Sequence, residues 1–510
     1  MTSELYKKIS TIDRWLITIV VMSATLMQVI DSTIVNVALP HMQGELSASP
    51  SEITWTLTSY LVASAIFMPL TGYFSDRFGR KNYLIISIAG FTFVSALCGA
   101  SISLNEIIIF RLLQGVLGAS LVPLSQAILA DIFPPEERGK AMAIWGIGIM
   151  VGPILGPTLG GYLTDVASWR WTFYINVPIG FFTLLLANII PDTPKHPRNM
   201  DWLGLGLLTL AIGGTQYVLD RGNQNDWFSS TSICLMTYLA ITGLLGFILH
   251  STQKKTQSVF SLEIFKDENF VIASILMIFF IVAMYGVLVI LPLMMEGLLN
   301  YPAFTTGLII APRGVSGMIS MFIVGKLITR IDPRWFIITG CIISAAGMWI
   351  CVYYSLNISP SWLIWPMILQ GFGIGMIIVP LSTVAFSTLQ NKLRTDGAGF
   401  FSLVRTMGGS IGISIAITIF VRRTQVFWHE LGGNVDPYHL AVYQYLAPLH
   451  LLPTQVVGTA LLTNELYQQA AMLSYTNVFV WMMWCFLIMI PLAFFLKQGK
   501  KTTPPLEIKK

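Results

Sequence analysis

Long runs of apolar residues recur along the whole chain, separated by short segments that hold most of the charged and turn-forming residues. Most runs reach the roughly 20 residues that a helix needs to cross the hydrocarbon core of a bilayer. We therefore predict an all-α membrane protein with fourteen spanning helices. These occupy residues 15–39, 52–73, 82–101, 105–129, 140–163, 170–190, 202–219, 231–250, 270–295, 303–325, 335–355, 361–387, 398–421 and 473–496.

The first predicted helix carries a polar stripe. It places the carboxylate of Asp31 inside an apolar run, with Gln28, Ser32 and Asn36 beside it at four-residue spacing. An ionised side chain near the middle of the bilayer costs roughly 2.5 to 3.5 kcal/mol on insertion scales, so such residues usually serve a function. We predict that this helix lines a wet cavity and that these four side chains bind substrate there.

The two halves of the chain resemble each other. LQGVLG followed by VPLS at 113–125 returns as LQGFGIG followed by VPLS at 369–382. Parallel repeats of this kind predict two bundles that face each other, with substrate bound between them near the midplane. The predicted parts are a six-helix bundle (1–190), a linker with two extra spanning helices (191–264) and a second six-helix bundle (265–510) with a long external loop at about 423–472.

Composition excludes several classes of protein. With 54% hydrophobic and 11% charged residues, the chain has too little polar surface for a soluble globule. Its five cysteines form no CxxC pair, so neither a metal site nor a disulfide framework is predicted, and no cofactor is expected. The basic residues form no patch with interleaved aromatics, which argues against nucleic acid as a partner.

The distribution of basic residues predicts the orientation in the membrane. If both termini are cytoplasmic, few Lys and Arg fall in segments assigned to the outside, as the positive-inside bias requires. Those assigned outside are Arg170, Arg221, Arg422 and Arg423.

A basic turn, GYFSDRFGRK, follows the second predicted helix at 72–81. Its glycines allow a sharp reversal and close approach of helices. The stretch resembles the signature of the major facilitator superfamily, in which the Asp and Arg are thought to form a charged latch to the other half that holds the outward-open state. The resemblance implies a conformational latch at Gly72, Asp76, Arg77, Gly79, Arg80 and Lys81.

The fifth predicted helix contains glycines at strict four-residue intervals, two of them followed by proline. Such a stripe lets another backbone approach closely, while the prolines bend the helix. The pattern resembles the antiporter motif of drug and proton exchangers in the superfamily, which favours antiport over symport. The motif residues are Gly148, Gly152, Pro153, Gly156, Pro157, Gly160 and Gly161.

Three further stretches, IDSTIVNVALP, RLLQG and WRWTFYINVPIG, together with the helix count, are similar to the fourteen-helix drug and proton antiporters. This resemblance covers nearly the whole chain. It implies proton-driven multidrug export across a bacterial inner membrane by alternating access, with lipophilic drugs and protons as ligands. It also implies two protein partners, a periplasmic adaptor and an outer-membrane channel.

Depth arithmetic pairs two charged residues. Asp31 and Arg111 lie about 8 and 6 residues from the outer ends of their helices, hence at roughly 12 and 9 Å depth. We predict that they form the proton-coupling site, with Gln114 nearby contributing to substrate binding. The alternative is a static ion pair that only fixes two helices.

Arg313 and Arg405 lie in predicted helices of the second half, which contain no acidic residue. If both face the cavity and bind substrate, its field is net positive and favours lipophilic anions or weak acids over dications. The alternative is that they reach the membrane surface or bind backbone carbonyls.

Two rival functions stay open at this point. The chain could export one dedicated metabolite or siderophore. An intramembrane enzyme would need convergent catalytic groups, and the sequence shows no such set. It also lacks a GxxxxGK[ST] nucleotide-binding element, so ATP is not the expected energy source. The 423–472 segment is predicted either to lie on the membrane or to dock a partner.

Overall fold

The computed structural model describes residues 10–134, 137–193, 195, 200–253, 261–433, 435, 439–453 and 455–497, and all regular structure in these ranges is helical. The first half contains α2 (Thr11–Glu45), α3 (Pro50–Ile53), α4 (Trp55–Phe67), α5 (Thr71–Phe78), α6 (Arg80–Ala100), α7 (Leu104–Gly118), α8 (Leu121–Ile132), α9 (Arg138–Val166), α10 (Trp171–Tyr174) and α11 (Asn176–Ala187). The linker contains α12 (Trp202–Arg221) and α13 (Thr231–Gln253). The second half contains α14 (Glu268–Pro292), α15 (Ala303–Leu327), α16 (Pro333–Cys351), α17 (Pro360–Ser387), α18 (Arg394–Gly432), α19 (Leu440–Leu446) and α20 (Val456–Ala493). Short 3-10 or π turns are η2 (Met68–Leu70), η4 (Trp227–Ser229), η5 (Leu262–Lys266), η6 (Leu293–Leu298), η7 (Asn391–Leu393) and η8 (Ala447–Leu449).

Several helices begin where the sequence supplies a capping side chain. Ser10, Asp201, Asp267 and Asp332 each accept a hydrogen bond from a backbone N–H in the first turn of α2, α12, α14 and α16. Such caps satisfy N–H groups that have no partner within the helix.

Among the described residues, twelve helices are long and apolar enough to cross a membrane. The 29-residue α9 and the shorter apolar helix Trp171–Ala187 account for the remaining two predicted runs. The second and fourth runs are each broken, as α4 with α5 and α7 with α8. The prediction of an all-α membrane protein is confirmed, and every predicted run falls on a helix.

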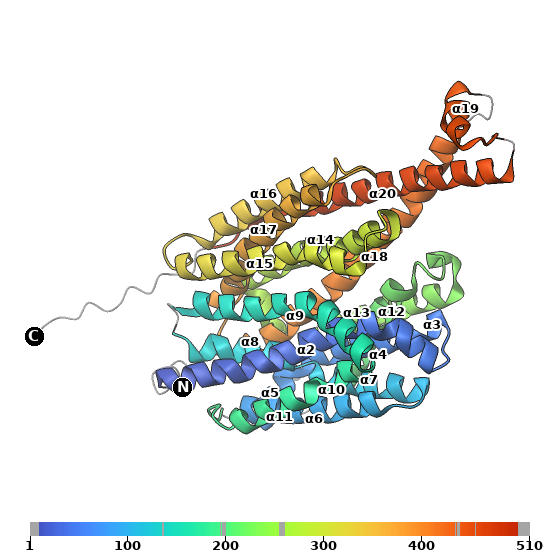
Figure 1. Cartoon of the computed structure of the whole chain (residues 1–510). Helices are drawn as coiled ribbons and strands as arrows, with labels where there is room; N and C mark the ends of the chain where they lie inside the picture. The colour runs from blue at the N-terminus through green and yellow to red at the C-terminus, as the bar shows by residue number, and fades with distance from the viewer. Residues whose placement is uncertain are drawn as a thin grey trace, which may run out of the picture.

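The two halves form separate layers of long helices (Figure 1). The linker helix α12 contacts both: Arg221 donates to Thr54 Oγ1 of the first half at 3.0 Å, and Gln216 donates to Ser410 Oγ of the second at 2.7 Å. The inserted helix therefore spans the boundary between the bundles next to α4 and α18.

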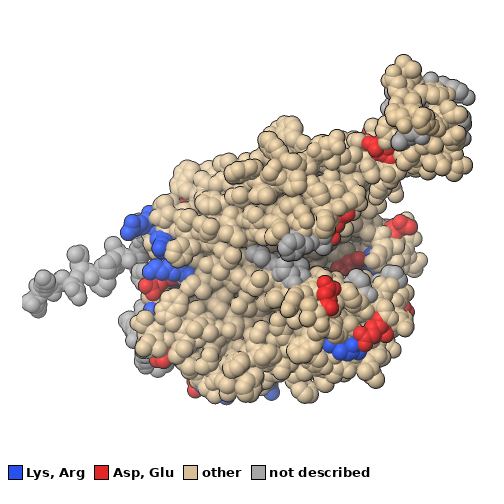
Figure 2. All heavy atoms as spheres, viewed as in Figure 1, with Lys and Arg blue, Asp and Glu red and all other residues tan. Residues whose placement is uncertain are grey.

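The bundles touch at the end of the molecule where α2 begins. There Arg394 of α18 donates to Asp131 of α8 at 2.7 Å, and the side chain of Asp396 lies directly over Gly72 of α5. Toward the opposite end, the surface between the bundles is hollowed (Figure 2). The structure is thus closed at the end of the 72–81 segment.

The prediction of a loop over 423–472 is wrong for most of its length. The 39-residue α18 and the 38-residue α20 each span close to 60 Å at 1.5 Å per residue, against a hydrocarbon core of about 30 Å. Both continue as a projecting helical pair with α19 at its tip (Figure 1). Aromatic contacts hold the pair together, including Phe420 stacked on Tyr475 at 4.4 Å and Trp428 against Tyr467 at 6.2 Å between ring centroids.

Candidate proton and substrate site

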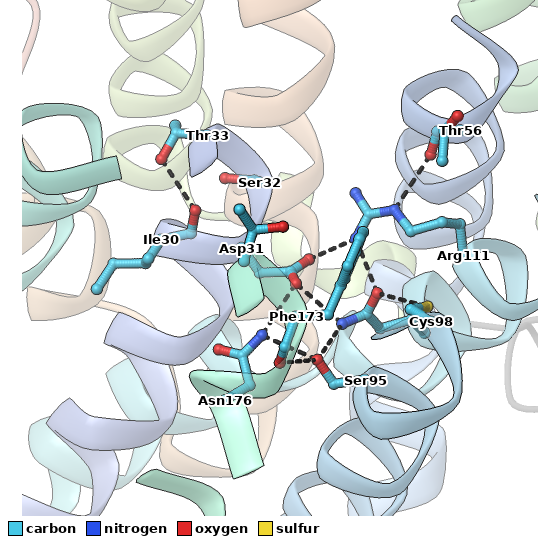
Figure 3. Close-up of polar contacts among 12 residues, drawn as sticks. Ile30, Asp31, Ser32, Thr33, Thr56, Ser95, Cys98, Arg111, Phe173 and Asn176 are labelled. Carbon is cyan, nitrogen blue, oxygen red and sulfur yellow. Dashed lines mark hydrogen bonds and ion pairs between the residues drawn. The ribbon is translucent and has the colours of Figure 1, made fainter. Parts of the chain in front are cut away.

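The predicted charge pair is formed. Arg111 Nη1 donates to Asp31 Oδ2 at 2.6 Å, and both side chains are fully buried (Figure 3). A pair removed from water in this way is sensitive to its hydrogen bonding, because low-dielectric surroundings strengthen each interaction and penalise every unpaired group. The two charges come from α2 and α7, so the pair joins the first helix to the fourth spanning helix.

Three neutral residues complete the shell around Asp31. Gln114 Nε2 and Asn176 Nδ2 donate to Asp31 Oδ1 at 2.9 and 3.0 Å. Both amides also donate to Ser95 Oγ, at 3.2 and 3.0 Å, and Ser95 donates to the carbonyl of Phe173 at 2.9 Å. Every member of this network is buried, and it draws on α2, α6, α7, α10 and α11.

Arg111 is held by further contacts. Its Nε donates to the carbonyl of Thr56 at 3.1 Å, and its guanidinium lies 4.2 Å from the ring centroid of Tyr60. A cation over an aromatic face is stabilised by the ring quadrupole. Its Nη2 is buried and finds no hydrogen-bond partner among the described residues. Hydrogen bonds from its other two nitrogens and the Tyr60 ring therefore fix the guanidinium in place.

In the described part, none of the other stripe residues of α2 is hydrogen-bonded to Asp31, Arg111 or Gln114, although Gln28 lies beside Tyr60. Gln28 is buried and accepts from the backbone N–H of Val122 at 3.1 Å. Ser32 donates to the Val29 carbonyl of its own helix at 2.8 Å, while Asn36 is exposed. Of the predicted stripe, the structure brings only Asp31 together with Arg111 and Gln114.

The two arginines of the second half lie in different surroundings. Arg313 is buried, and its Nη2 donates to the Met284 carbonyl at 3.3 Å. Arg405 lies with its guanidinium 5.5 Å from the ring of Trp145 in the opposite bundle. One guanidinium nitrogen of each is buried with no hydrogen-bond partner in the described ranges. Arg313 thus binds a carbonyl, and Arg405 lies between the two bundles.

The 72–81 segment forms α5, a turn and the start of α6. Arg77 donates to Tyr73 of its own helix at 3.1 Å, and Lys81 donates to the Asn188 carbonyl at 2.8 Å. Gly79 has φ +82°, a conformation that glycine adopts without strain. Asp76 and Gly72 lie on α5, with Gly72 against Asp396 as described above.

The ion pair that crosses between the bundles here uses an acid outside the predicted latch residues. Asp131 of α8 pairs with Arg80 from its own half and with Arg394 from the other. Arg80 thus takes part through Asp131, and Asp131 joins both halves.

The glycine stripe of α9 packs against α2. A methyl group added at Gly152 would lie 2.2 Å from the Val29 side chain, and one at Gly156 would lie 2.1 Å from Thr33 Oγ1. Thr33 Oγ1 also donates to the Gly152 carbonyl at 3.1 Å. Gly148 and Gly160 likewise face α2, and Gly161 lies beside it, whereas the side chains of Pro153 and Pro157 lie outside the described part. The motif therefore holds the helix that carries Asp31.

A further carboxylate of α2, Glu45, lies at the C-terminal end of the helix. Glu45 accepts from Trp169 Nε1 at 2.5 Å and from the guanidinium of Arg170. The hydrogen bond from Arg170 is the largest cause that holds the pKa of Glu45 below its usual value, against an opposing effect of partial burial. The cluster ties the segment before α10 to α2, and Asn176 follows it by only a few residues.

The chain matches the family model described as Major Facilitator Superfamily over residues 21–413. It is 34% identical over 495 residues to the multidrug export protein EmrB of Escherichia coli (strain K12), covering 94% of this chain and 95% of that protein. It is 31% identical over 483 residues to the fatty acid resistance protein FarB of Neisseria gonorrhoeae, covering 93% and 94%. Among solved structures, the proton:xylose symporter XylE matches with a TM-score of 0.60 at 16% identity, covering 96% of this chain and 100% of that one.

Proposed function

Because the chain belongs to the major facilitator superfamily, as its motifs predicted, we propose that it exports lipophilic drugs in exchange for protons by alternating access. The observation that carries the proton part is the fully buried Asp31–Arg111 pair. The likeness to a multidrug export protein along nearly the whole chain supports drug export.

Protonation of Asp31 would change the charge of this buried site by one unit. A neutral carboxyl is no longer attracted to the charge of Arg111 and offers one acceptor position fewer. Protonation therefore changes the equilibrium between the two conformations of the transporter. A proton entering from outside would allow the inward change. Its loss to the cytoplasm would accompany drug binding, so the two ligands alternate at one region.

We propose that the part of the substrate site formed by the second half of the chain favours anionic substrates. Arg313 and Arg405 each keep a buried guanidinium nitrogen without a described partner, and the spanning helices around them contribute no carboxylate. The likeness to a protein named for fatty-acid resistance supports the same direction. An exporter of one dedicated metabolite is the rival, and it would respond to a single compound.

The test is substrate-induced proton release from purified protein in liposomes, across matched anionic, neutral and cationic lipophiles. We expect several compounds to release protons, with anions most effective. Arg313→Ala should weaken the anion response more than the cation response. Equal loss for both classes would indicate a structural role for Arg313. A response to one compound alone would favour the dedicated exporter.

We further place the protein in a bacterial inner membrane with both termini cytoplasmic. The distribution of charge supports this orientation, because Lys and Arg gather at the end of the molecule where α2 begins (Figure 2). The projecting pair of α18 and α20 would then extend into the periplasm.

An EmrA-like adaptor and a TolC-like outer-membrane channel are the proposed protein partners. The tip of the projection exposes large apolar side chains, including Val456 at 84%, Leu440 at 69% and Val457 at 58% of their surface. Exposed apolar groups that cluster beyond the membrane suit a protein interface.

Charging the tip tests the adaptor proposal. The double variant Leu440→Glu with Val456→Glu should transport normally in liposomes but lose drug resistance in cells, because only the assembled path needs the partner. Ile102→Glu, an equally exposed position on the outer side of the first half, serves as the matched control. Loss of transport in liposomes as well would count against docking.

A further inference from the structure

We propose that Asn176 is the positioning residue that responds to the protonation state of Asp31, by exchanging its amide N–H for its amide oxygen. The inference rests on the proposed proton exchange at Asp31. It concerns what the protein does with the proton once it has arrived.

The shell around Asp31 is built for a carboxylate that only accepts. Its three direct partners are the guanidinium of Arg111 and the amide nitrogens of Gln114 and Asn176, all of which donate. A protonated carboxyl carries an O–H group that must itself donate. Asp31 Oδ1 is contacted only by two neutral amides, so a proton can bind there without displacing the charged Arg111. In the described arrangement, however, that proton would face only N–H groups, none of which can accept it.

Asn176 can supply the missing acceptor. Its Oδ1 is buried and has no hydrogen-bond partner among the residues described. The corresponding oxygen of Gln114 already accepts from Arg111 Nη1 at 2.7 Å and from Cys98 Sγ at 3.6 Å. Turning the Asn176 amide therefore breaks no bond to its oxygen, whereas turning Gln114 would break two. The hydroxyl of Ser95 can reorient with the amide, since a hydroxyl both donates and accepts.

The remaining groups near the carboxylate do not provide this response. The charged or titratable side chains that face Asp31 are Arg111 from α7, Tyr60 from α4 and Cys98 from α6, while α9 presents glycines and Thr33 to α2. The Tyr60 hydroxyl is buried but makes no hydrogen bond to Asp31 within the described residues.

The position of Asn176 in the chain explains how a change in its hydrogen bonding would reach the neighbouring helices. It is the first residue of α11, directly after the break that follows α10. Upstream, Trp169 and Arg170 are fixed to Glu45 of α2. The segment 169–176 therefore contacts two carboxylates of one helix, and a change at Asp31 alters one of its two attachments.

The test compares Asn176→Leu with Asn188→Leu, the same change at an exposed position near the end of α11. Leucine keeps the volume but neither donates nor accepts. In Asn176→Leu, the ionised Asp31 loses a charge-assisted hydrogen bond, whereas the protonated Asp31 loses only a weaker neutral one. The substitution therefore favours the protonated form, and Asp31 releases its proton at a higher pH. We expect the pH midpoint of drug-induced proton release to rise by about one unit.

Infrared difference spectra give a second measurement, the vibrational frequency of the protonated Asp31. This frequency would not change if Asn176 only supported the packing of the helices. The O–H stretch of the protonated carboxyl, identified because it disappears in Asp31→Asn, should shift to higher frequency in Asn176→Leu, because the O–H loses its acceptor. Asn176→Thr, whose hydroxyl can donate and accept, should restore the wild-type frequency. Asn188→Leu should leave both readouts unchanged.

The outcomes separate the inference from the proposed function. A raised midpoint with an unchanged O–H frequency would mean that Asn176 only donates to Asp31, and it would overturn the inference. An unchanged midpoint would overturn it as well. Proton release that persists in Asp31→Asn would instead overturn the proposed proton site.

Discussion

Asp31→Asn is expected to abolish drug-induced proton release and export against a gradient, while leaving a folded protein that still binds drug. Asparagine is nearly isosteric with aspartate, and its oxygen can still accept from Arg111. It cannot ionise, so the site loses the charge change that couples proton and drug. Proton release and concentrative transport in liposomes measure the effect, and Asp31→Glu should retain part of both.

The same substitution leaves Arg111 as a buried cation without its counter-charge. Breaking a buried pair by removing one partner costs about 3 to 5 kcal/mol, so a lower melting temperature is expected. The double variant Asp31→Asn with Arg111→Gln removes the unpaired charge and should recover stability without recovering coupling. If Asp31→Asn exports at the wild-type rate, the proton site lies elsewhere, and the exposed Glu296 of η6 is the next candidate.

The helices and the charge pair could be predicted because both follow from one-dimensional quantities. Run length gives a spanning helix, and residue count along a helix gives depth. Asp31 and Arg111 were paired by depth alone, and their side chains lie 2.6 Å apart. The glycine spacing likewise predicted close approach of a neighbouring helix, although it could not say that the neighbour is α2.

The rest of the site could not be predicted because it depends on where a helix breaks and on how the helices pack. Asn176 reaches Asp31 from the start of α11, and Ser95 is one of many serines in apolar runs. Neither polarity nor spacing separates them from residues that only pack. The stretch WRWTFYINVPIG, which contains Asn176, was the one available signal.

The projection was missed for a related reason. The segments VRRTQVFWHELG and NELYQQAAM are polar enough to resemble a loop beside apolar runs. In the projection, however, α18 and α20 pack against each other. A helix with many polar residues can therefore continue beyond the bilayer. Asp131 could not be predicted because it lies just past the end of the predicted helix 105–129, where an acid is common, and only the folded protein places Arg394 of the other half beside it.

Arg394→Gln is expected to open the closed end of the protein. Arg394 is buried, and its pair with Asp131 at 2.7 Å crosses between the bundles, whereas the Arg80 pair with the same carboxylate lies within one bundle. If a bond exists in only one of two conformations, losing it changes the free-energy difference between them by the full contribution of that bond. A change of about 1.4 kcal/mol alters the ratio of the two conformations tenfold. We expect at least that change in favour of the form open at this end, with slower export.

Ile328 offers a place to measure this change, because it lies at 8% exposure against Gly139 of the opposite bundle. In a background without the exposed Cys234, Ile328→Cys should react slowly with a polar maleimide and about tenfold faster when Arg394→Gln is added. Arg80→Gln is the matched control, since it removes a guanidinium from the same carboxylate without removing a contact between bundles. Labelling that stays slow in both the Arg394→Gln and the Arg80→Gln proteins would show that the pair across the bundles does not stabilise the closed end, and the closure would then rest on apolar contacts such as that of Ile328 itself.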